Sequence, residues 1–194
     1  MSTRSATSVD PRSPYVLDTR ELGRRPGSMR RVQRTAAAPA DWTLELVRVP
    51  EDAEVELDLR LEAVMEGVLV SGTVRAPLAA ECGRCLEQVD ASLEAEVQEL
   101  FAYDPEDAGD EVSVLTGDLL DLRPLLRDAI VLAMPINPVC DDDCAGLCAT
   151  CGSKLADLPA DHAHDDLDPR WSTLSALRSA DASSSNPATP EIGR

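Results

Sequence analysis

Six cysteines in this sequence fall into two groups whose spacing is typical of metal ligands. The first is the C-x2-C pair Cys82 and Cys85, in which Gly83 lets the chain curl so that both sulfurs face one ion. The second group, spaced C-x3-C-x3-C-x2-C, consists of Cys140, Cys144, Cys148 and Cys151. Zinc takes four soft ligands in a tetrahedron, and two such groups brought together by a fold supply them. The sequence therefore predicts a zinc site.

Six thiolates exceed the four that one zinc ion needs, so the spacing leaves three ligand sets open. The first set takes both C-x2-C pairs, Cys82, Cys85, Cys148 and Cys151. The second set joins the early pair to Cys140 and Cys144. The third set uses the four later cysteines alone. In the first two sets the site would close a loop of 54 residues or more between Cys85 and the later group.

Other uses of these thiols are less consistent with the sequence. A redox C-x-x-C motif stands at a helix N-terminus, whereas Cys82 and Cys85 lie between two β-type patterns. An iron–sulfur cluster also takes four cysteines, and spacing alone does not separate it from zinc. His162 and His164 are further candidate ligands, but a loop histidine without a fixed spacing to a cysteine pair is more often exposed. We therefore rank zinc first, and cysteine ahead of histidine.

The sequence contains no recognisable catalytic constellation. It lacks a Gly-rich phosphate loop, a Gly-x-Ser-x-Gly elbow and a His-Glu-x-x-His motif. The acidic run 141–143 could bind a hard cation, but an acidic tripeptide between zinc ligands more often serves solubility. A catalytic zinc ion keeps an open coordination position, and the excess of cysteines argues for a closed site. We therefore expect a protein that is not an enzyme.

The charge of the chain is extreme and unevenly placed. The net charge is −18, yet residues 1–34 hold eight arginines against three acids, a net of +5 that leaves −23 for the rest. An acidic body repels phosphate and suits basic protein partners, so we expect a basic partner protein. The arginine-rich segment Arg20–Arg34 is expected to contact RNA or an acidic face of the chain's own body, or to remain a solvated arm.

The sequence also predicts a cytoplasmic location. No stretch approaches the roughly 20 apolar residues of a membrane helix, and residues 1–14 lack the apolar run of a secretory signal. Paired cysteines in a reducing compartment more often bind metal or do redox work than form structural disulfides.

The middle of the chain is predicted to form the strands that position the first cysteine pair. Residues 42–49, 55–62 and 93–97 alternate apolar and polar side chains, and residues 68–74 form a further strand after a turn. In residues 55–62 a period of two places every acid on the solvent face. These adjacent runs predict an antiparallel meander or a small open barrel with one buried face.

The flanking segments are predicted to be a short strand, a loop and two helices. Residues 15–22 are expected as a first strand or extended segment, and residues 23–34 as a basic loop. A helix is predicted between Asp121, its expected N-cap, and the stop at Met134-Pro135. A Cys-rich loop follows at 140–152, and a short C-terminal helix runs from Asp168 to Leu177.

These elements predict an α+β fold in one domain. We expect a disordered tail at 1–14, a single domain at 15–178 with its Cys-rich, zinc-binding segment at 140–152, and a disordered tail at 179–194.

Four stretches of the sequence resemble a known family. They are Val16–Leu22, Gly67–Val74 continuing into Glu81–Leu86, Asp121 through Cys140 to Gly152, and Asp168–Trp171. The chain resembles the YceD family, the large ribosomal RNA subunit accumulation proteins, over about residues 15–178. The second and third stretches are the most specific.

The resemblance implies a role in the accumulation of large-subunit ribosomal RNA, and hence in ribosome assembly. It also implies a partner among the small zinc-ribbon proteins of the large subunit. Some family members lack cysteines that match Cys148 and Cys151, which keeps the second ligand set open. The expected function is that of a non-catalytic zinc-binding assembly factor whose acidic face binds a basic ribosomal protein. The alternative is a thiol-redox or zinc-handling protein, which the two additional cysteines favour.

Overall fold

The computed structural model describes residues 9–104 and 113–164. The chain divides into two compact units, residues 1–146 and 147–194, and this boundary falls inside the segment 15–178 that was expected to be one domain. The predicted C-terminal helix at 168–177 and the tail at 179–194 lie outside the described residues. Within the described ranges, no helix is long and apolar enough to cross a membrane.

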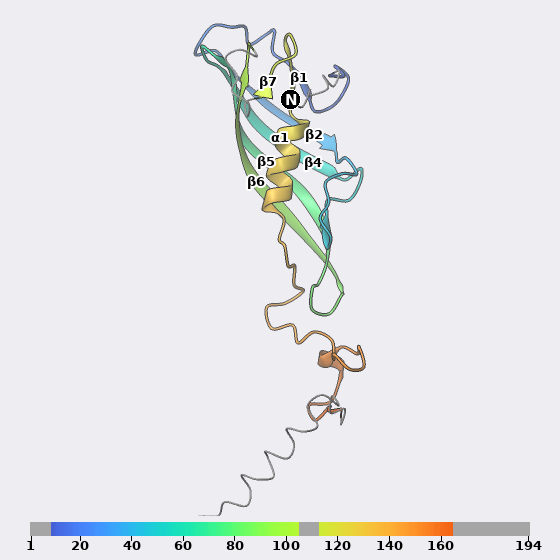
Figure 1. The fold of residues 1–194 in the computed structure, drawn as a ribbon. Coiled ribbons are helices and arrows are strands. Elements are labelled where there is room, and N and C mark those ends of the chain that lie inside the picture. The colour runs from blue at the N-terminus through green and yellow to red at the C-terminus, as the bar shows by residue number, and fades with distance from the viewer. Residues whose placement is uncertain (1–8, 105–112, 165–194) are drawn as a thin grey trace, which may run out of the picture. The chain divides into compact units, whose positions relative to one another are not determined.

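An open, mainly antiparallel sheet forms the first unit (Figure 1). Its strands in hydrogen-bonded order are β2 (Met29–Ala37), β4 (Glu54–Ala63), β5 (Gly67–Glu81), β6 (Gln88–Ala102) and β7 (Ser113–Val114). The short strand β3 (Val47–Arg48) also pairs with β5, and β7 pairs in parallel with β6. A separate two-stranded sheet joins β1 (Val16–Asp18) to β8 (Leu119–Asp121). The predicted α+β fold with an antiparallel sheet is confirmed, and the described strands leave the sheet unclosed.

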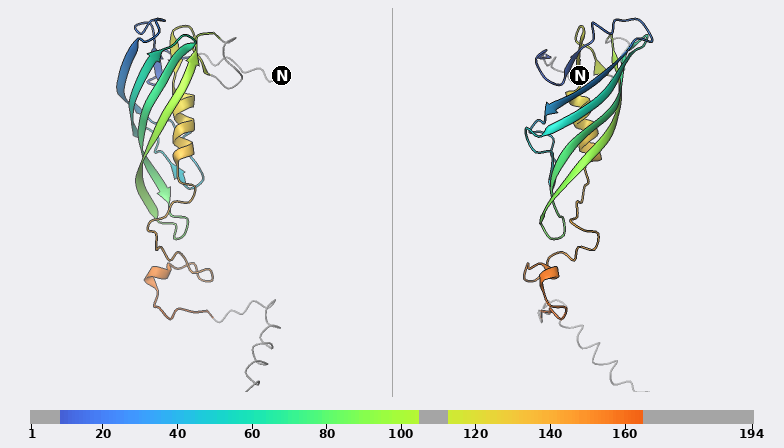
Figure 2. Two further views of the ribbon diagram at one scale, coloured as in Figure 1. Left: turned by 90° about the vertical axis from the view of Figure 1, so that its left-hand side faces the viewer. Right: turned by 180° about the vertical axis from the view of Figure 1, so that it is seen from behind.

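The helix α1 (Arg123–Ala133) packs on one face of this sheet, against β5 and β6 (Figure 2). Leu122, Leu126 and Ile130 are fully buried, as the helical spacing predicts. The helix stops at Met134, also as predicted. The predicted N-cap is wrong, because Leu122 occupies that position; the carboxylate of Asp121 instead accepts a hydrogen bond from the N–H of Arg123 at 2.9 Å.

The strand β4 confirms the alternation predicted for residues 55–62. Its apolar side chains Val55, Leu57, Leu59 and Leu61 are each at most 2 % exposed, and the polar residues between them face outward. Burial of one face and hydration of the other fixes the register, because a one-residue shift would reverse both.

The predicted strand at 42–49 is wrong over most of its length. The N–H of Leu44 donates to the carbonyl of Val47 at 2.7 Å, so the chain turns back on itself and only Val47–Arg48 joins the sheet. The alternating burial comes from the two arms of this turn: Trp42 lies on one arm, while Val47 and Val49 lie on the other.

The predicted basic loop at 23–34 is also partly wrong, because residues from Met29 onward form the edge strand β2. Only Val32 and Ala36 of this strand are buried. Apolar residues four positions apart are too sparse to show a period of two, so the strand could not be recognised from hydrophobicity.

Gly72 lies in β5 where two neighbouring backbones approach closely. Its φ of +152° is one that side-chain-bearing residues rarely adopt, and a Cβ atom there would overlap the carbonyl of Asp58 and lie 2.9 Å from the Cα of Leu59. We expect Gly72→Ala to lower the free energy of unfolding by about 1–3 kcal/mol, because the strand pair must separate to admit a methyl group. Urea unfolding measures this change. The adjacent Ser71→Ala is the control, and equal stability of the two variants would contradict the prediction.

Candidate metal centre

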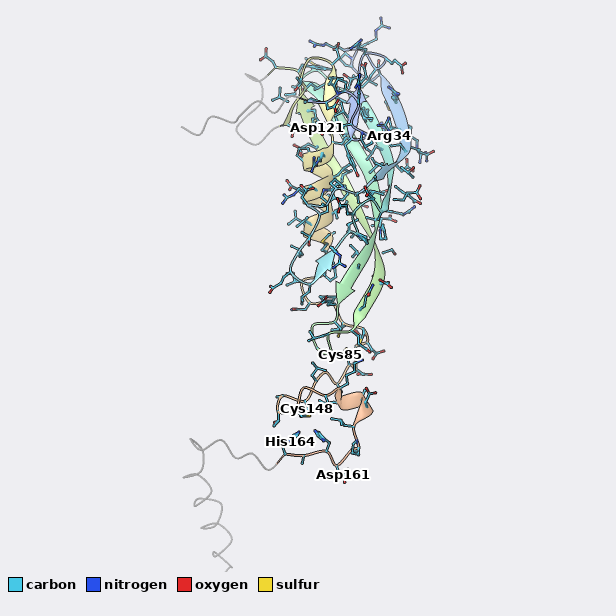
Figure 3. All side chains as sticks on the ribbon, turned by 90° about the vertical axis from the view of Figure 1, so that its right-hand side faces the viewer. Arg34, Cys85, Asp121, Cys148, Asp161 and His164 are labelled. Carbon is cyan, nitrogen blue, oxygen red and sulfur yellow. The ribbon has the colours of Figure 1, made fainter. Side chains whose placement is uncertain are left out.

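Four cysteines of the first unit come together where the β5–β6 hairpin meets the loop after α1. Cys82 and Cys85 occupy the turn of this hairpin, and Cys140 and Cys144 approach from the loop. Figure 3 shows Cys85 at the end of the first unit opposite to Arg34 and Asp121. The group joins parts of the chain that are 54 residues or more apart. Its first two cysteines are held by the hairpin, whose strands are regularly hydrogen-bonded.

The four sulfur atoms converge on one point. All lie within 4.8 Å of one another, with Cys82 3.9 Å from Cys144 and Cys85 3.5 Å from Cys140. These separations exceed the roughly 2.05 Å of a disulfide bond, and the six cysteines are free thiols. Cys82 and Cys85 are buried, so the group is open to solvent only on the side of the loop.

Hydrogen bonds to backbone carbonyls hold the loop against the hairpin turn. The N–H of Gly83 donates to the carbonyl of Pro138 at 2.9 Å. The guanidinium of Arg84 donates to the carbonyls of Asp142 and Cys144 at 2.9 and 3.1 Å. Arg84 therefore fixes the position of Cys144, a role that the sequence does not predict. An arginine between two cysteines gives no signal for such a contact.

Gly146 allows the loop to pass close to the backbone of Arg84 in the hairpin turn. Its φ is +79°, and a Cβ atom would stand 3.1 Å from the carbonyl oxygen of Arg84. A glycine is therefore required where the loop passes the hairpin turn.

The four thiols bind their protons unequally. Hydrogen bonding from the backbone of Cys85 is the largest of several influences that lower the pKa of Cys82 to about 6. The neighbouring thiols of Cys85 and Cys144 raise the pKa of Cys140 to about 12. Thiolates at this distance repel one another, so a bound cation is what would allow all four to lose their protons.

A second group of ligand side chains lies within the second unit. It consists of Cys148, Cys151, His162 and His164, whose ligand atoms also lie within 4.8 Å of one another. A hydrogen bond from the side chain of Ser153 is the largest influence that lowers the pKa of Cys151 to about 6. The thiol of Cys151 in turn raises the pKa of His164.

Of the three predicted ligand sets, the structure assembles the second, Cys82, Cys85, Cys140 and Cys144. Cys148 and Cys151 fall instead into the group with the two histidines, which rank behind cysteine as ligands on sequence grounds. The His-x-His spacing that follows the last C-x2-C pair is the signal that could have placed them higher.

Fold and site together define an α+β protein with two groups of metal-ligand side chains. The model of the YceD family, described as large ribosomal RNA subunit accumulation protein YceD, matches residues 70–178. The chain belongs to this family.

The chain is also similar to several bacterial proteins. It is 44 % identical over 167 residues to the uncharacterized protein Rv2926c of Mycobacterium tuberculosis, covering 84 % of this chain and 80 % of that protein. It is 41 % identical over 175 residues to ML1660 of Mycobacterium leprae, covering 87 % and 80 %. It is 25 % identical over 127 residues to YlbN of Bacillus subtilis, covering 64 % and 72 %. No solved structure matches the chain.

Proposed function

We propose that this chain is a non-catalytic, zinc-binding cytoplasmic factor that supports the accumulation of large-subunit ribosomal RNA. The family match carries the proposal, because the family is described by that role. The matched residues 70–178 include all six cysteines.

The geometry of the four-cysteine group supports zinc as the metal. Four sulfurs at the zinc–sulfur bond length of about 2.3 Å stand about 3.8 Å apart in a tetrahedron. The separations of 3.5 and 3.9 Å between opposed cysteines fall on either side of this value. An iron–sulfur cluster would hold its thiolates farther apart, since several irons and sulfides lie between them.

Four thiolates leave no coordination position for a substrate, which supports a structural role for this zinc ion. Bound there, the ion would cross-link the β5–β6 hairpin to the loop after α1. The acidic surfaces of the first unit would then be presented on a rigid body.

The partner is, in this proposal, a basic protein of the large subunit, bound in a groove between β6 and α1. The groove has a volume of about 620 Å³, and its lining includes Glu96, Glu99, Asp128 and the apolar side chain of Leu132 but no lysine or arginine. Among the described residues, neither Glu96 nor Glu99 has an ion-pair partner. Elsewhere on the sheet, Asp58 is paired with Arg31 at 2.6 Å and Glu94 is paired with Arg75. Unpaired acids beside an exposed leucine suit a basic, partly apolar segment.

The arginine-rich segment Arg20–Arg34 is largely engaged within the chain. Arg30 pairs with Glu21 at 3.3 Å, Arg34 donates to the carbonyl of Pro14 at 2.6 Å, and Arg24 lies 4.8 Å from the centre of the Tyr103 ring. These contacts reduce the positive charge available to phosphate. We therefore propose that ribosomal RNA plays the smaller part in binding and meets the exposed loop around Arg25.

The alternative, a thiol-redox or zinc-handling protein, is favoured by one observation. Cys151 is exposed, whereas Cys82 and Cys85 are buried. If this alternative holds, Cys148 and Cys151 will cycle with oxidant in the metal-loaded protein, and thiol titration measures this.

Depletion with complementation tests the assembly role. We expect cells depleted of the protein to lose large-subunit particles and their RNA on sucrose gradients, with the small subunit unchanged. Wild type should restore them, Cys82→Ser/Cys85→Ser should not, and Glu96→Gln/Glu99→Gln should restore them only in part. Glu45→Gln/Glu51→Gln, which removes two exposed acids elsewhere, serves as the control and should restore them fully. Normal subunit ratios in depleted cells would refute the proposal.

A further inference from the structure

Residues 147–164 adopt a defined local structure without a hydrophobic core. The described part of this unit contains a bridge between Leu147 and Lys154 and a single 3-10 turn at Leu155–Asp157. None of its apolar side chains is buried, and Leu155 is 36 % exposed. A segment this short that buries no apolar surface needs another source of stability, which in small domains is a disulfide or a metal ion.

The turn at Cys148–Cys151 repeats the backbone pattern of the turn at Cys82–Cys85. In the earlier turn the N–H of Cys82 donates to the carbonyl of Glu87 at 2.8 Å, and the N–H of Leu86 donates to the carbonyl of Cys82 at 2.9 Å.

The corresponding atoms in the later turn make the same two bonds. The N–H of Cys148 donates to the carbonyl of Ser153 at 2.8 Å, and the N–H of Gly152 donates to the carbonyl of Cys148 at 2.8 Å. The residue after the second cysteine has positive φ in both turns, +61° at Leu86 and +71° at Gly152. The second turn thus has the backbone of a metal-binding cysteine pair.

Two histidines complete the ligand set on the open side of this turn. The Nε2 atoms of His162 and His164 are 2.9 Å apart, and the sulfur of Cys151 is 3.7 Å from Nε2 of His162. Their rings meet edge to face, with centroids 4.6 Å apart. Figure 3 shows Cys148 and His164 facing the same space within this unit, whereas Asp161 lies at its margin. The four ligand atoms can reach a single ion.

We propose that Cys148, Cys151, His162 and His164 form a second zinc site, independent of the four-cysteine site, and that zinc serves as the core of residues 147–164. Two thiolates and two imidazoles are a common tetrahedral set for structural zinc. The proposal goes beyond the ribosomal role and does not depend on it.

Two properties distinguish the second site from the first. Two thiolates neutralise the charge of Zn²⁺, whereas four leave a net charge of −2. Cys151 and His164 are exposed, while the first site has two buried ligands, so a chelator reaches the second ion more easily. The second zinc ion will therefore leave first in a graded chelator titration, and residues 147–164 will then become sensitive to protease.

Metal analysis of the full-length protein tests the proposal. We expect two zinc ions per chain in the wild type and one in each of Cys148→Ser/Cys151→Ser and His162→Ala/His164→Ala. Asp161→Asn, which changes an exposed carboxylate in the same segment, is the matched control and should keep two. One zinc ion in the wild type, unchanged by His162→Ala/His164→Ala, would overturn the proposal.

Cobalt substitution gives a second measurement that does not rely on zinc content. Loss of Cys148 and Cys151 should remove about one third of the thiolate-to-metal charge-transfer intensity, because that site contributes two of the six thiolates. Loss of the histidines should remove the absorption of one tetrahedral site while leaving that of the four-cysteine site. A spectrum unchanged by either variant would also overturn the proposal.

Discussion

Cys82→Ser/Cys85→Ser will release one zinc ion per chain and strongly destabilise the first unit. Both cysteines are buried in the turn of the β5–β6 hairpin, and opposed sulfurs of the group are only 3.5 and 3.9 Å apart. A ligand that binds only the folded state stabilises it by about 4 kcal/mol when its free concentration is 1,000 times its dissociation constant. We therefore expect a loss of at least about 4 kcal/mol in free energy of unfolding at zinc saturation. Urea unfolding with and without chelator measures it.

The structure offers a matched control for this variant. Cys148→Ser/Cys151→Ser makes the same chemical change in the second unit and should leave the unfolding of the first unit unchanged. Chelator should shift the unfolding midpoint of the wild type and of this control, but not that of Cys82→Ser/Cys85→Ser. If chelator shifts the Cys82→Ser/Cys85→Ser protein as far as the wild type, the first unit does not hold its metal through these residues.

Leu126→Ala will lower the free energy of unfolding of the first unit by about 2–5 kcal/mol. Leu126 is fully buried where α1 packs on the sheet, next to Ile130 on the same helix face. Removing its side chain loses the transfer free energy of the apolar atoms and leaves a cavity that the surrounding strands can only partly fill. The expected loss is a large share of the stability of a typical domain.

Leu132→Ala is the control for this prediction. It makes the same substitution on the same helix, but Leu132 is 86 % exposed, so we expect a change within about 0.5 kcal/mol. Guanidinium unfolding followed by circular dichroism measures both variants. Similar losses for the two substitutions would mean that α1 does not pack on the sheet through the face described.

The sequence predicts those elements that bury a single apolar face, because the pattern is visible among neighbouring residues. The alternation in residues 55–62 and the helical spacing from Leu122 to Ala133 each report a single apolar face, and both elements form where expected. The edge strand β2 was missed because it buries only Val32 and Ala36. The segment at 42–49 is predicted as one strand because its apolar residues alternate with polar ones, but these residues belong to the two arms of one turn.

The sequence predicts which residues bind metal, but not which of the cysteines lie together. The spacing of the cysteines indicated metal binding, yet the choice among three ligand sets depends on where the loop after α1 meets the β5–β6 hairpin. That meeting is set by non-local contacts, such as the bonds from Arg84 to the carbonyls of Asp142 and Cys144, which no spacing rule contains. The histidines rank low on sequence grounds because they have no fixed spacing to a cysteine pair. In the fold, the turns between Cys151 and His162 bring them back to that pair.

The zinc-bound fold depends above all on one metal ion that Cys82, Cys85, Cys140 and Cys144 are expected to hold. X-ray absorption at the zinc edge tests this on full-length Cys148→Ser/Cys151→Ser, purified without added metal, in which only the first site retains its thiolates. We expect one zinc ion surrounded by four sulfur atoms at about 2.3 Å, with no nitrogen or oxygen neighbour. A protein without zinc, or a shell with two sulfurs and two lighter atoms, would contradict it.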